Sequence, residues 1–217
     1  MKERPILFSA PMVRAILDGT KTQTRRIVKV QPPATTSDVF TFLHPDPREH
    51  FYAFDGDALL DWSYPCPLGE AGDRLYVRET WQHSNHPLGP YDDECEVFYR
   101  ADYLDDPLGP DLERSRDGIR RQWRPSIHMP RAAARTLLDV TGVRIERLNA
   151  ISDADCIAEG IGLTGAAEGV LLTDLLESLP RAHFRQLWES ISGPGSWDAN
   201  PWVWVIEFKR VDGAKGA

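Results

Sequence analysis

The sequence is poor in the residues that build disulfide frameworks and metal sites. Its 217 residues include three cysteines, which lie far apart and form no CxxC pair, at Cys66, Cys95 and Cys156. An odd number of scattered cysteines does not make a disulfide framework, so a reducing compartment fits best. The six histidines form no HxxxH or HExxH pattern. We therefore expect no bound metal and no other cofactor.

Long apolar runs are also missing. The longest one near the N-terminus, residues 5–10, is too short for the apolar part of a signal peptide or for a membrane span. We therefore expect a cytoplasmic protein with no membrane partner. At 41% hydrophobic and 27% charged residues, the chain can nevertheless bury a substantial core.

An excess of positive charge is the third thing the chain lacks, because its formal net charge is −8. Non-specific binding of nucleic acid depends on many Lys and Arg residues, so we expect no long duplex footprint. Seven arginines do gather in one stretch, at Arg114, Arg116, Arg120, Arg121, Arg124, Arg131 and Arg135. A solvated surface is the favoured interpretation of this run, and a phosphate-contacting patch is the alternative.

The pattern of apolar and turn residues predicts an α+β chain that is mainly β. Strands are expected at about 20–30, 74–81, 97–101, 136–148 and 202–211, and short helices after Ser9, after Ser152 and at about 181–191. Such a series fits a small β-barrel with loop insertions better than a doubly wound sheet. We expect one domain over 1–217, with excursions at about 31–66, 84–122 and 162–180.

Four short motifs are the most informative part of the sequence. They read GTKTQTRR at 19–26, GDRLYVRETW at 72–81, AEG at 158–160 and NPWVWV at 200–205. In this order they resemble the ASCH family, and specifically its longer form, which is frequent in bacteriophages and prophages. The resemblance implies a PUA-like β-barrel, a fold associated with recognition of RNA and modified bases.

One compact branch of the ASCH family hydrolyses the amide of N4-acetylcytidine. In that branch a lysine and a threonine of a G-x-K-T-x-T-x-R motif act together with a glutamate. The motif is matched here from Gly19 to Arg26, and Glu159 is the counterpart of the glutamate. The resemblance therefore implies that Lys21, Thr24 and Glu159 are catalytic, with Thr22 and Arg26 contacting the substrate.

The same residues suit amide hydrolysis on chemical grounds, because that reaction needs a nucleophile and a base. Thr24 offers a hydroxyl. Lys21 can act as a base only if burial or a cationic neighbour, such as Arg25 or Arg26, lowers its pKa. Glu159 would then orient the lysine or move a proton to the leaving amine.

Each of these assignments has a structural alternative. On a regular strand Lys21 and Thr24 point to opposite faces, so their convergence requires a bulge or turn near Thr22. The alternative for this segment is an edge strand whose charges prevent aggregation. For Glu159, at the end of a helix where its charge opposes the dipole, the alternative is an ion pair with a nearby arginine such as Arg147.

Three further residues are candidates for substrate binding. Arg78 and Glu79 are consecutive on a predicted strand, so one should point inward, either to contribute to the cleft or to form a structural ion pair. Trp197 lies in a polar loop and could stack on a base.

Three functions remain open at this point. The first is an amidohydrolase acting on N4-acylated cytidine or a related nucleoside. The second is a module that binds an RNA base or modified nucleotide without chemistry, and the third is a ribonuclease that uses the lysine as a charge stabiliser. The acidic net charge favours a small substrate over long RNA, and hence the first function. The sequence leaves the oligomeric state open.

Overall fold

The structure is a computed structural model and describes residues 1–42, 50–86, 88–105, 123–161 and 179–211. Parts of the predicted excursions 31–66, 84–122 and 162–180 thus lie outside the described residues. The chain divides into two compact units. Unit 1 comprises Met1–Gly19, Asp73–Asp139 and Arg210–Ala217, and unit 2 comprises Thr20–Gly72 and Val140–Lys209. Each unit is described by itself below.

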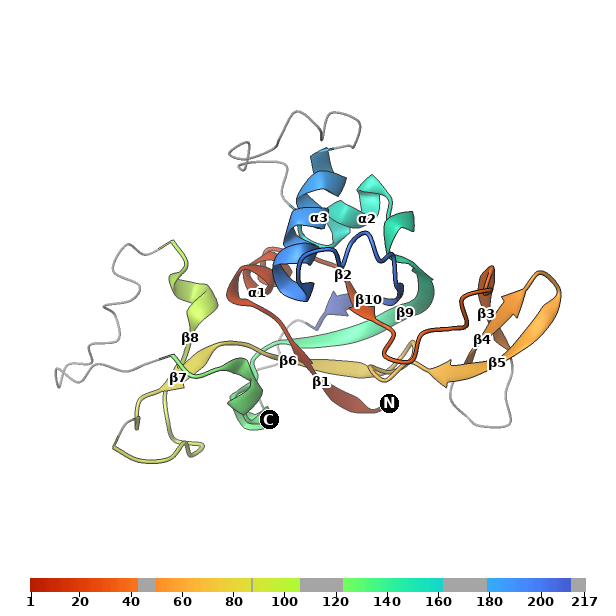
Figure 1. Cartoon of the computed structure of the whole chain (residues 1–217). Helices are drawn as coiled ribbons and strands as arrows, with labels where there is room; N and C mark the ends of the chain where they lie inside the picture. The colour runs from red at the N-terminus through yellow and green to blue at the C-terminus, as the bar shows by residue number, and fades with distance from the viewer. Residues whose placement is uncertain (43–49, 87, 106–122, 162–178, 212–217) are drawn as a thin grey trace. The chain divides into compact units, whose positions relative to one another are not determined.

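Unit 1 is built from short strands and one α-helix (Figure 1). Its elements are β1 (Glu3–Leu7), α1 (Ala10–Leu17), β6 (Arg74–Arg78), β7 (Trp81–His83), β8 (Val97–Tyr99), the 3₁₀ turns η1 (Arg100–Tyr103), η2 (Ser126–His128) and η3 (Arg131–Ala133), and the start of β9 (Leu137–Arg147). β1 runs parallel to β6, and β6 pairs antiparallel with the start of β9. β7 and β8 form a separate antiparallel pair.

Strand alternation explains the core of unit 1. Along β6, Leu75 and Val77 are buried while the residues between them are partly exposed. Their neighbours across the sheet include Leu138 on β9 and Ile6 on β1, which are also buried. Successive strand residues point to opposite faces, so one apolar face is enough to build this core.

The first helix begins and ends as the sequence predicts. Ser9 occupies the N-cap position, although its side chain makes no capping hydrogen bond, and a proline lies in the first turn. Gly19 follows the helix with φ of 75°, a left-handed conformation that glycine adopts without a steric penalty. The turn at Gly19 directs the chain toward the GTKTQTRR segment.

Unit 2 contains the remaining strands and two α-helices. Its elements are β2 (Gln23–Ile27), β3 (Asp38–Phe42), β4 (His50–Asp55), β5 (Ala58–Pro65), the rest of β9, the 3₁₀ turn η4 (Leu148–Ala150), α2 (Asp153–Ala158), α3 (Leu179–Ser192) and β10 (Trp202–Arg210). In this unit β10 lies between β9 and β2, and it pairs antiparallel with β2. All residues from Trp202 to Ile206 are buried, as expected for a strand covered on both faces.

The segment 31–66, predicted as an excursion, forms a three-stranded antiparallel sheet in the order β3-β4-β5. Its inner face contacts β10 through the rings of Phe51 and Trp204, whose centroids are 5.1 Å apart in an edge-to-face arrangement. Trp62 on β5 also donates its indole N–H to the carbonyl of Val30 at 2.9 Å. The excursion is therefore an added meander within unit 2.

The two helices of unit 2 pack on a shared apolar core. Ser152 and Asp155 form the reciprocal capping box that the sequence predicts at the start of α2. Apolar side chains of α2, α3 and β10 then meet in one buried cluster, which consists of Leu148, Ile151, Cys156, Phe184, Trp188, Trp197, Val203 and Val205. This cluster lies beneath the charged residues described in the next section.

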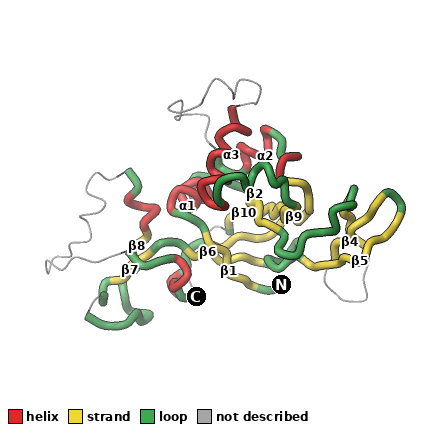
Figure 2. Tube along the Cα trace, in the orientation of Figure 1, coloured by secondary structure: helices red, strands yellow, loops and turns green. Residues whose placement is uncertain are grey.

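The protein is α+β and mainly β, with three α-helices in the described residues (Figure 2). The expected closed barrel is wrong for this part of the chain. The outer strands β1 and β2 each pair on one side only, with β6 and β10 respectively, so the sheets stay open. A barrel requires its edge strands to pair and close. No helix among the described residues is long and apolar enough to cross a membrane.

Candidate functional site

The GTKTQTRR segment meets the end of helix α2 before strand β2 begins. Lys21 and Glu159 form an isolated antiparallel bridge, and the backbone N–H of Thr22 donates to the carbonyl of Ala158 at 2.8 Å. On its other side the carbonyl of Thr22 accepts from the N–H of Phe208 at 2.9 Å. Lys21 therefore lies outside the regular strand, and the two backbone hydrogen bonds of the next residue, Thr22, hold this part of the chain in place.

The side chains of Lys21 and Glu159 form a buried ion pair. The Lys21 Nζ lies 2.8 Å from Oε2 of Glu159, and it also donates to the carbonyl oxygen of Glu159 at 2.7 Å. Only 1% of the Lys21 side chain and 5% of the Glu159 side chain are exposed. Because Glu159 is the C-cap of α2, the ammonium satisfies a helix-terminal carbonyl and offsets the unfavourable carboxylate at that end.

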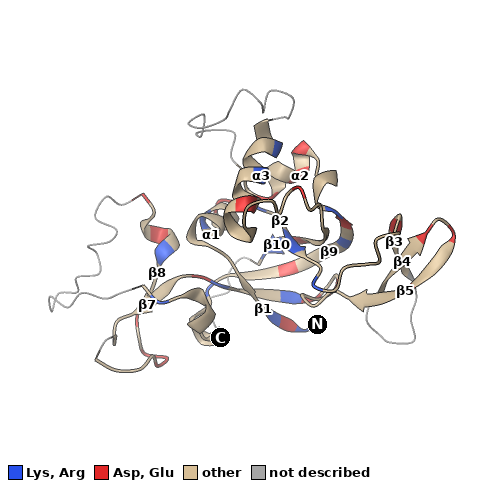
Figure 3. Ribbon diagram, viewed as in Figure 1, with Lys and Arg blue, Asp and Glu red and all other residues tan. Residues whose placement is uncertain are grey.

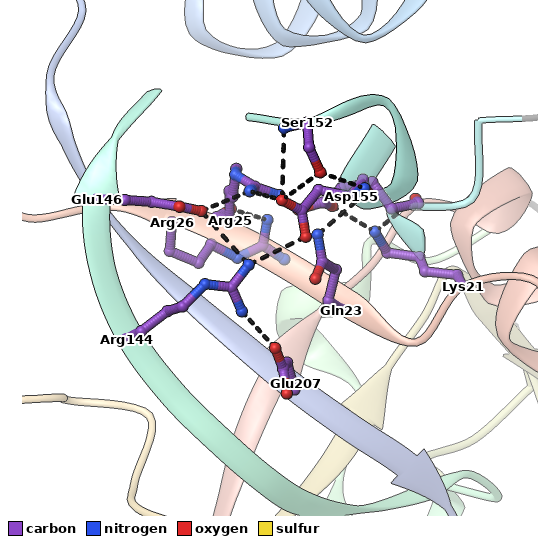
Figure 4. A network of polar contacts seen from close by, with 10 residues as sticks. Lys21, Gln23, Arg25, Arg26, Arg144, Glu146, Ser152, Asp155 and Glu207 are labelled. Carbon is purple, nitrogen blue, oxygen red and sulfur yellow. Dashed lines mark hydrogen bonds and ion pairs between the residues drawn. The ribbon is translucent and has the colours of Figure 1, made fainter. Parts of the chain in front are cut away.

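Arg25 holds the second oxygen of the same carboxylate, because its Nη1 lies 3.2 Å from Oε1 of Glu159. Its Nη2 lies 2.5 Å from Oε1 of Glu146 and 3.3 Å from Oδ2 of Asp155 (Figure 4). The side chain is fully buried, and its guanidinium lies 5.9 Å from the ring centroid of Phe184 on α3. One guanidinium therefore joins three acidic groups from β9 and α2.

Further polar residues surround this centre, of which Arg144 and Glu207 are accessible to water and Gln23 is buried. Arg144 on β9 pairs with Oδ1 of Asp155 at 3.0 Å and also with Glu207 on β10. Gln23 donates its amide to the carbonyl of Asp155 at 3.0 Å. Basic and acidic residues alternate along β9, as Figure 3 shows, and this alternation puts Arg144 and Glu146 on one face.

Burial sets the protonation of the central lysine. Desolvation lowers the pKa of Lys21 below its usual value, and the charges of Arg26 and Arg25 lower it further, while the charge and hydrogen bond of Glu159 oppose the shift. Desolvation likewise lowers the pKa of Arg26, again opposed by Glu159. The lowered pKa brings the lysine amine closer to a form that can accept a proton.

Asp155 behaves in the opposite way to a simple buried acid. Burial raises its pKa, but hydrogen bonds from Ser152 and Gln23 and the charges of Arg25 and Arg144 outweigh burial and lower it overall. Asp155 is therefore held as an anion beside Arg25.

The other residues of the predicted site lie in different places. Thr24 is buried and pairs with Ile206 across β2 and β10. Strand alternation places it on the face opposite Gln23 and Arg25, so its assignment as the nucleophile stays a prediction. Thr22 is exposed, as a substrate contact should be.

Arg78 and Glu79 belong to unit 1, where Glu79 is fully buried and paired. Arg135 donates to both of its carboxylate oxygens, from Nε at 3.0 Å and from Nη2 at 3.3 Å. The same guanidinium donates twice to Asp102, at 2.8 Å each. Arg78 instead donates to the carbonyl of Ile127. Of the two readings of this dipeptide, the geometry matches the structural ion pair.

Trp197 is placed in the core cluster of unit 2 with 4% of its surface exposed. The guanidinium of Arg181 lies 5.3 Å from its ring centroid. The loop around Trp197 is polar, as the sequence shows, but the ring itself is used for packing. Its assignment to a substrate cleft rests on the sequence pattern alone.

Sequence reasoning missed most partners of the central pair. Arg25 was considered only as a neighbour of Lys21, yet it is the nearby arginine with which Glu159 pairs. The example suggested for that role, Arg147, instead donates to the carbonyl of Asn200 and stacks on Trp202. The contribution of Glu146 went unnoticed. The one available signal was the Arg-x-Glu spacing at 144–146, which puts both charges on one face of a strand.

Among the described residues, no group of three or more His, Cys, Asp or Glu side chains is arranged to hold a metal ion. No protein-family model matches the chain, and neither the curated proteins nor the solved structures include a match. The functional conclusion therefore depends on the geometry of the site and on the sequence motifs.

Proposed function

We propose that the protein hydrolyses the amide of an N4-acylated cytosine nucleoside, with Lys21 and Glu159 as its proton-transfer pair. The observation that supports this most directly is the 2.8 Å contact between Nζ of Lys21 and Oε2 of Glu159, in which both side chains are buried. Buried ionisable pairs cost folding free energy relative to apolar residues, and perturbed pairs of this kind concentrate at functional sites.

The reaction assigns both proton steps to Lys21 and the positioning of its amine to Glu159. The neutral amine of Lys21 takes a proton from the attacking hydroxyl, and the oxygen forms a bond to the acyl carbon. The ammonium then returns the proton to N4 as the C–N bond breaks, which releases the cytosine nucleoside. If water attacks, the carboxylic acid is released directly. If the Thr24 hydroxyl attacks, the acyl group remains on its oxygen as an ester, which a water molecule then hydrolyses to the carboxylic acid and the free hydroxyl. Glu159 holds the amine in place and stabilises its charged form between the two steps.

The source of the attacking oxygen is either the Thr24 hydroxyl or a water molecule. Replacing Thr24 with valine keeps the shape and removes the hydroxyl, whereas Thr24→Ser keeps the hydroxyl. We expect Thr24→Val to lose turnover and Thr24→Ser to retain it if the threonine attacks. Thr20→Val is the matched control, because Thr20 belongs to the same segment, is exposed and is not a predicted site residue. Full turnover by Thr24→Val would assign the attack to water.

The charge of the site favours an uncharged nucleoside over an RNA phosphate. Four cationic groups, Lys21, Arg25, Arg26 and Arg144, face four acidic ones, Glu146, Asp155, Glu159 and Glu207 (Figure 4). This network has no surplus positive charge with which to bind a phosphate. The formal net charge of −8 acts in the same direction.

A module that binds a nucleotide without chemistry is the second candidate. It is favoured by the completeness of the ion pair, because Lys21 and Glu159 satisfy one another and are almost fully covered. The wider kinship with ASCH and PUA-like proteins is part of the proposal in either case. The four motifs support that kinship, and the open sheets described above would then be a variation on the barrel.

The deciding experiment is incubation of the pure protein with N4-acetylcytidine, followed by chromatography for cytidine. We expect turnover by the wild type and a loss of about 10²- to 10⁴-fold in Glu159→Gln, as for loss of a proton-transfer residue. Glu207→Gln is the control, because Glu207 is an exposed acid of the same network. Tight binding of the nucleoside without release of cytidine would favour the binding module instead.

A further inference from the structure

Arg25 is the member of the charged network whose role the sequence did not indicate. Its fully buried guanidinium lies in β2, next to the catalytic pair, and it contacts neither the solvent nor the amine of Lys21 through any described hydrogen bond. Its contacts are instead to acids. One terminal nitrogen of its guanidinium contacts Oε1 of Glu159, and the other contacts both Glu146 and Asp155.

The two oxygens of Glu159 are therefore divided between two cations. Oε1 lies 3.2 Å from Arg25, and Oε2 lies 2.8 Å from Lys21. A carboxylate at the end of a short helix can rotate about its own side-chain bonds unless both oxygens are held. Arg25 is itself fixed by Glu146 on β9 and Asp155 on α2. A planar guanidinium can hold several carboxylates in fixed directions better than an ammonium can.

We propose that Arg25 is a positioning residue, which holds Oε1 of Glu159 so that Oε2 stays directed at the Nζ of Lys21. This role rests on the proposed function, since it concerns the same proton-transfer pair. It extends that function by linking the geometry of the pair to acids on two other elements. We expect that loss of the Arg25 guanidinium frees the carboxylate of Glu159, and that the protons of the Lys21 ammonium then exchange with water more readily.

The charge of Arg25 adds a second, separable effect. It is one of the causes that lower the pKa of Lys21, so its removal should let the lysine titrate at a higher pH. The charged and titratable groups around Lys21 that remain in place in such a variant are Arg26, Arg144, Glu146, Asp155, Cys156, Glu159 and Glu207. Arg25→Lys keeps the positive charge but loses the planar guanidinium, so it separates the effect of the charge on the pKa of Lys21 from the positioning of Glu159.

The test uses three variants of the full chain: Arg25→Met, Arg25→Lys and, as the control, Arg144→Met. Arg144 contacts Glu146, Asp155 and Glu207 in the same network, and no described contact links it to Glu159. The first readout is hydrogen exchange of the Lys21 ammonium by NMR, with its signal assigned by its loss in Lys21→Arg. The second is the titration of Lys21 followed at its 13C-labelled Cε. Retained dispersion of the β10 amide signals shows that each variant is folded.

We expect the ammonium of Lys21 to exchange about tenfold faster or more in both Arg25 variants and at the wild-type rate in Arg144→Met, because exchange reports the fixed hydrogen bonds. Lys21 should titrate at a higher pH in Arg25→Met and near its wild-type position in Arg25→Lys. Unchanged exchange in Arg25→Met would overturn the proposal. Wild-type exchange in Arg25→Lys would overturn it too, since charge alone would then suffice.

These readouts do not depend on turnover. If the wild type fails to hydrolyse N4-acetylcytidine, the proposed function is wrong, while the exchange and titration results still decide whether Arg25 holds Glu159. If the wild type does hydrolyse it, kcat should fall in both Arg25 variants, whereas the pH at which activity rises should move upward only in Arg25→Met. Restoration of wild-type kcat by Arg25→Lys would contradict a positioning role.

Discussion

Both units bury a glutamate beside an arginine, yet the two arrangements have different chemical capacities. In unit 1, Glu79 is held by both ends of one guanidinium, and Arg135 also pairs with Asp102 and lies 3.9 Å from the ring centroid of Tyr99. In unit 2, Glu159 is shared between Arg25 and Lys21. An arginine does not give up its proton in a protein, whereas a buried lysine can.

The two pairs differ in whether the cation can release a proton, and not in how deeply the carboxylate is buried. The Glu79 side chain is fully buried and that of Glu159 is 5% exposed, so both carboxylates have lost nearly all contact with water. Burial raises the pKa of Glu79, opposed by the hydrogen bond and charge of Arg135. Burial also raises the pKa of the neighbouring Tyr99, to about 12. Unit 1 therefore contains a carboxylate paired with a guanidinium, while the cations around Glu159 in unit 2 include a lysine whose pKa is lowered, chiefly by burial.

The largest expected effect is on turnover and comes from Lys21→Arg. The substitution keeps the positive charge but places it on a guanidinium that cannot deprotonate, so hydrolysis should fall by about two to four orders of magnitude while the nucleoside still binds. Hydrolysis of N4-acetylcytidine and an unchanged thermal midpoint are the measurements. Lys29→Arg is the control, because Lys29 is exposed. Robust turnover by Lys21→Arg would exclude the lysine as the base.

The comparable change in unit 1, Arg135→Met, should act on stability. It leaves the buried Glu79 without the guanidinium that compensates its charge, which costs about 3–5 kcal/mol in similar buried pairs. Denaturant unfolding of the variant measures this loss. Glu79→Leu combined with Arg135→Met should recover most of it, because the uncompensated charge is then absent. If the double variant is as unstable as Arg135→Met, the cost comes from lost packing on Tyr99 instead.

The two units also differ in how much of them could be foreseen from the sequence. Local signals worked well: the Ser152–Asp155 capping box and the left-handed Gly19 are both present as predicted. Arg135 and Arg25 were not recognised as the partners of Glu79 and Glu159, because the residues of each pair lie 56 and 134 positions apart. Spacing along a sequence predicts neighbours on one element, whereas pairing between distant elements depends on the fold.

The meander at 31–66 shows a second reason for failure. The strand β4 was not predicted because it reads HFYAFD, with apolar residues at consecutive positions, although burial alternates along it. The prolines at 32 and 33 further suggested a loop. The position of Lys21 was missed for a related reason, since it belongs to an isolated bridge just before β2 and not to the regular strand.

A smaller effect, opposite in sign between the units, is expected in the pH dependence of stability. The pKa of Glu79 is raised by burial from 4.5, so its favourable contribution is present at low pH and is lost as pH rises through its folded value. The pKa of Asp155 is lowered from 3.8, so its contribution is present above that value and is lost as pH falls. The contributions of the two carboxylates to the free energy of unfolding should therefore change with pH in opposite directions.

Glu79→Gln and Asp155→Asn measure these slopes when each is compared with the wild type. Free energies of unfolding between about pH 3 and about pH 8 should show the advantage of wild type over Glu79→Gln shrinking with pH, and its advantage over Asp155→Asn growing. A shift of one pKa unit corresponds to about 1.4 kcal/mol, which is large enough to detect. Parallel slopes for the two variants would show that the units do not differ in this respect.

The smallest effect is expected where each network reaches the surface, at Arg144 in unit 2 and Arg131 in unit 1. Their side chains are 37% and 39% exposed, and their partners include Glu207 and Glu3, which are also accessible to water. Ion pairs in such positions contribute about 0–1 kcal/mol, because water competes for both charges and salt screens them. Arg144→Met and Arg131→Met should each lower the free energy of unfolding by no more than this, and added salt should reduce the difference. A loss above about 2 kcal/mol in Arg144→Met alone would mean that the outer ring of unit 2 supports its buried pair, and that the proton-transfer centre extends further than Arg25.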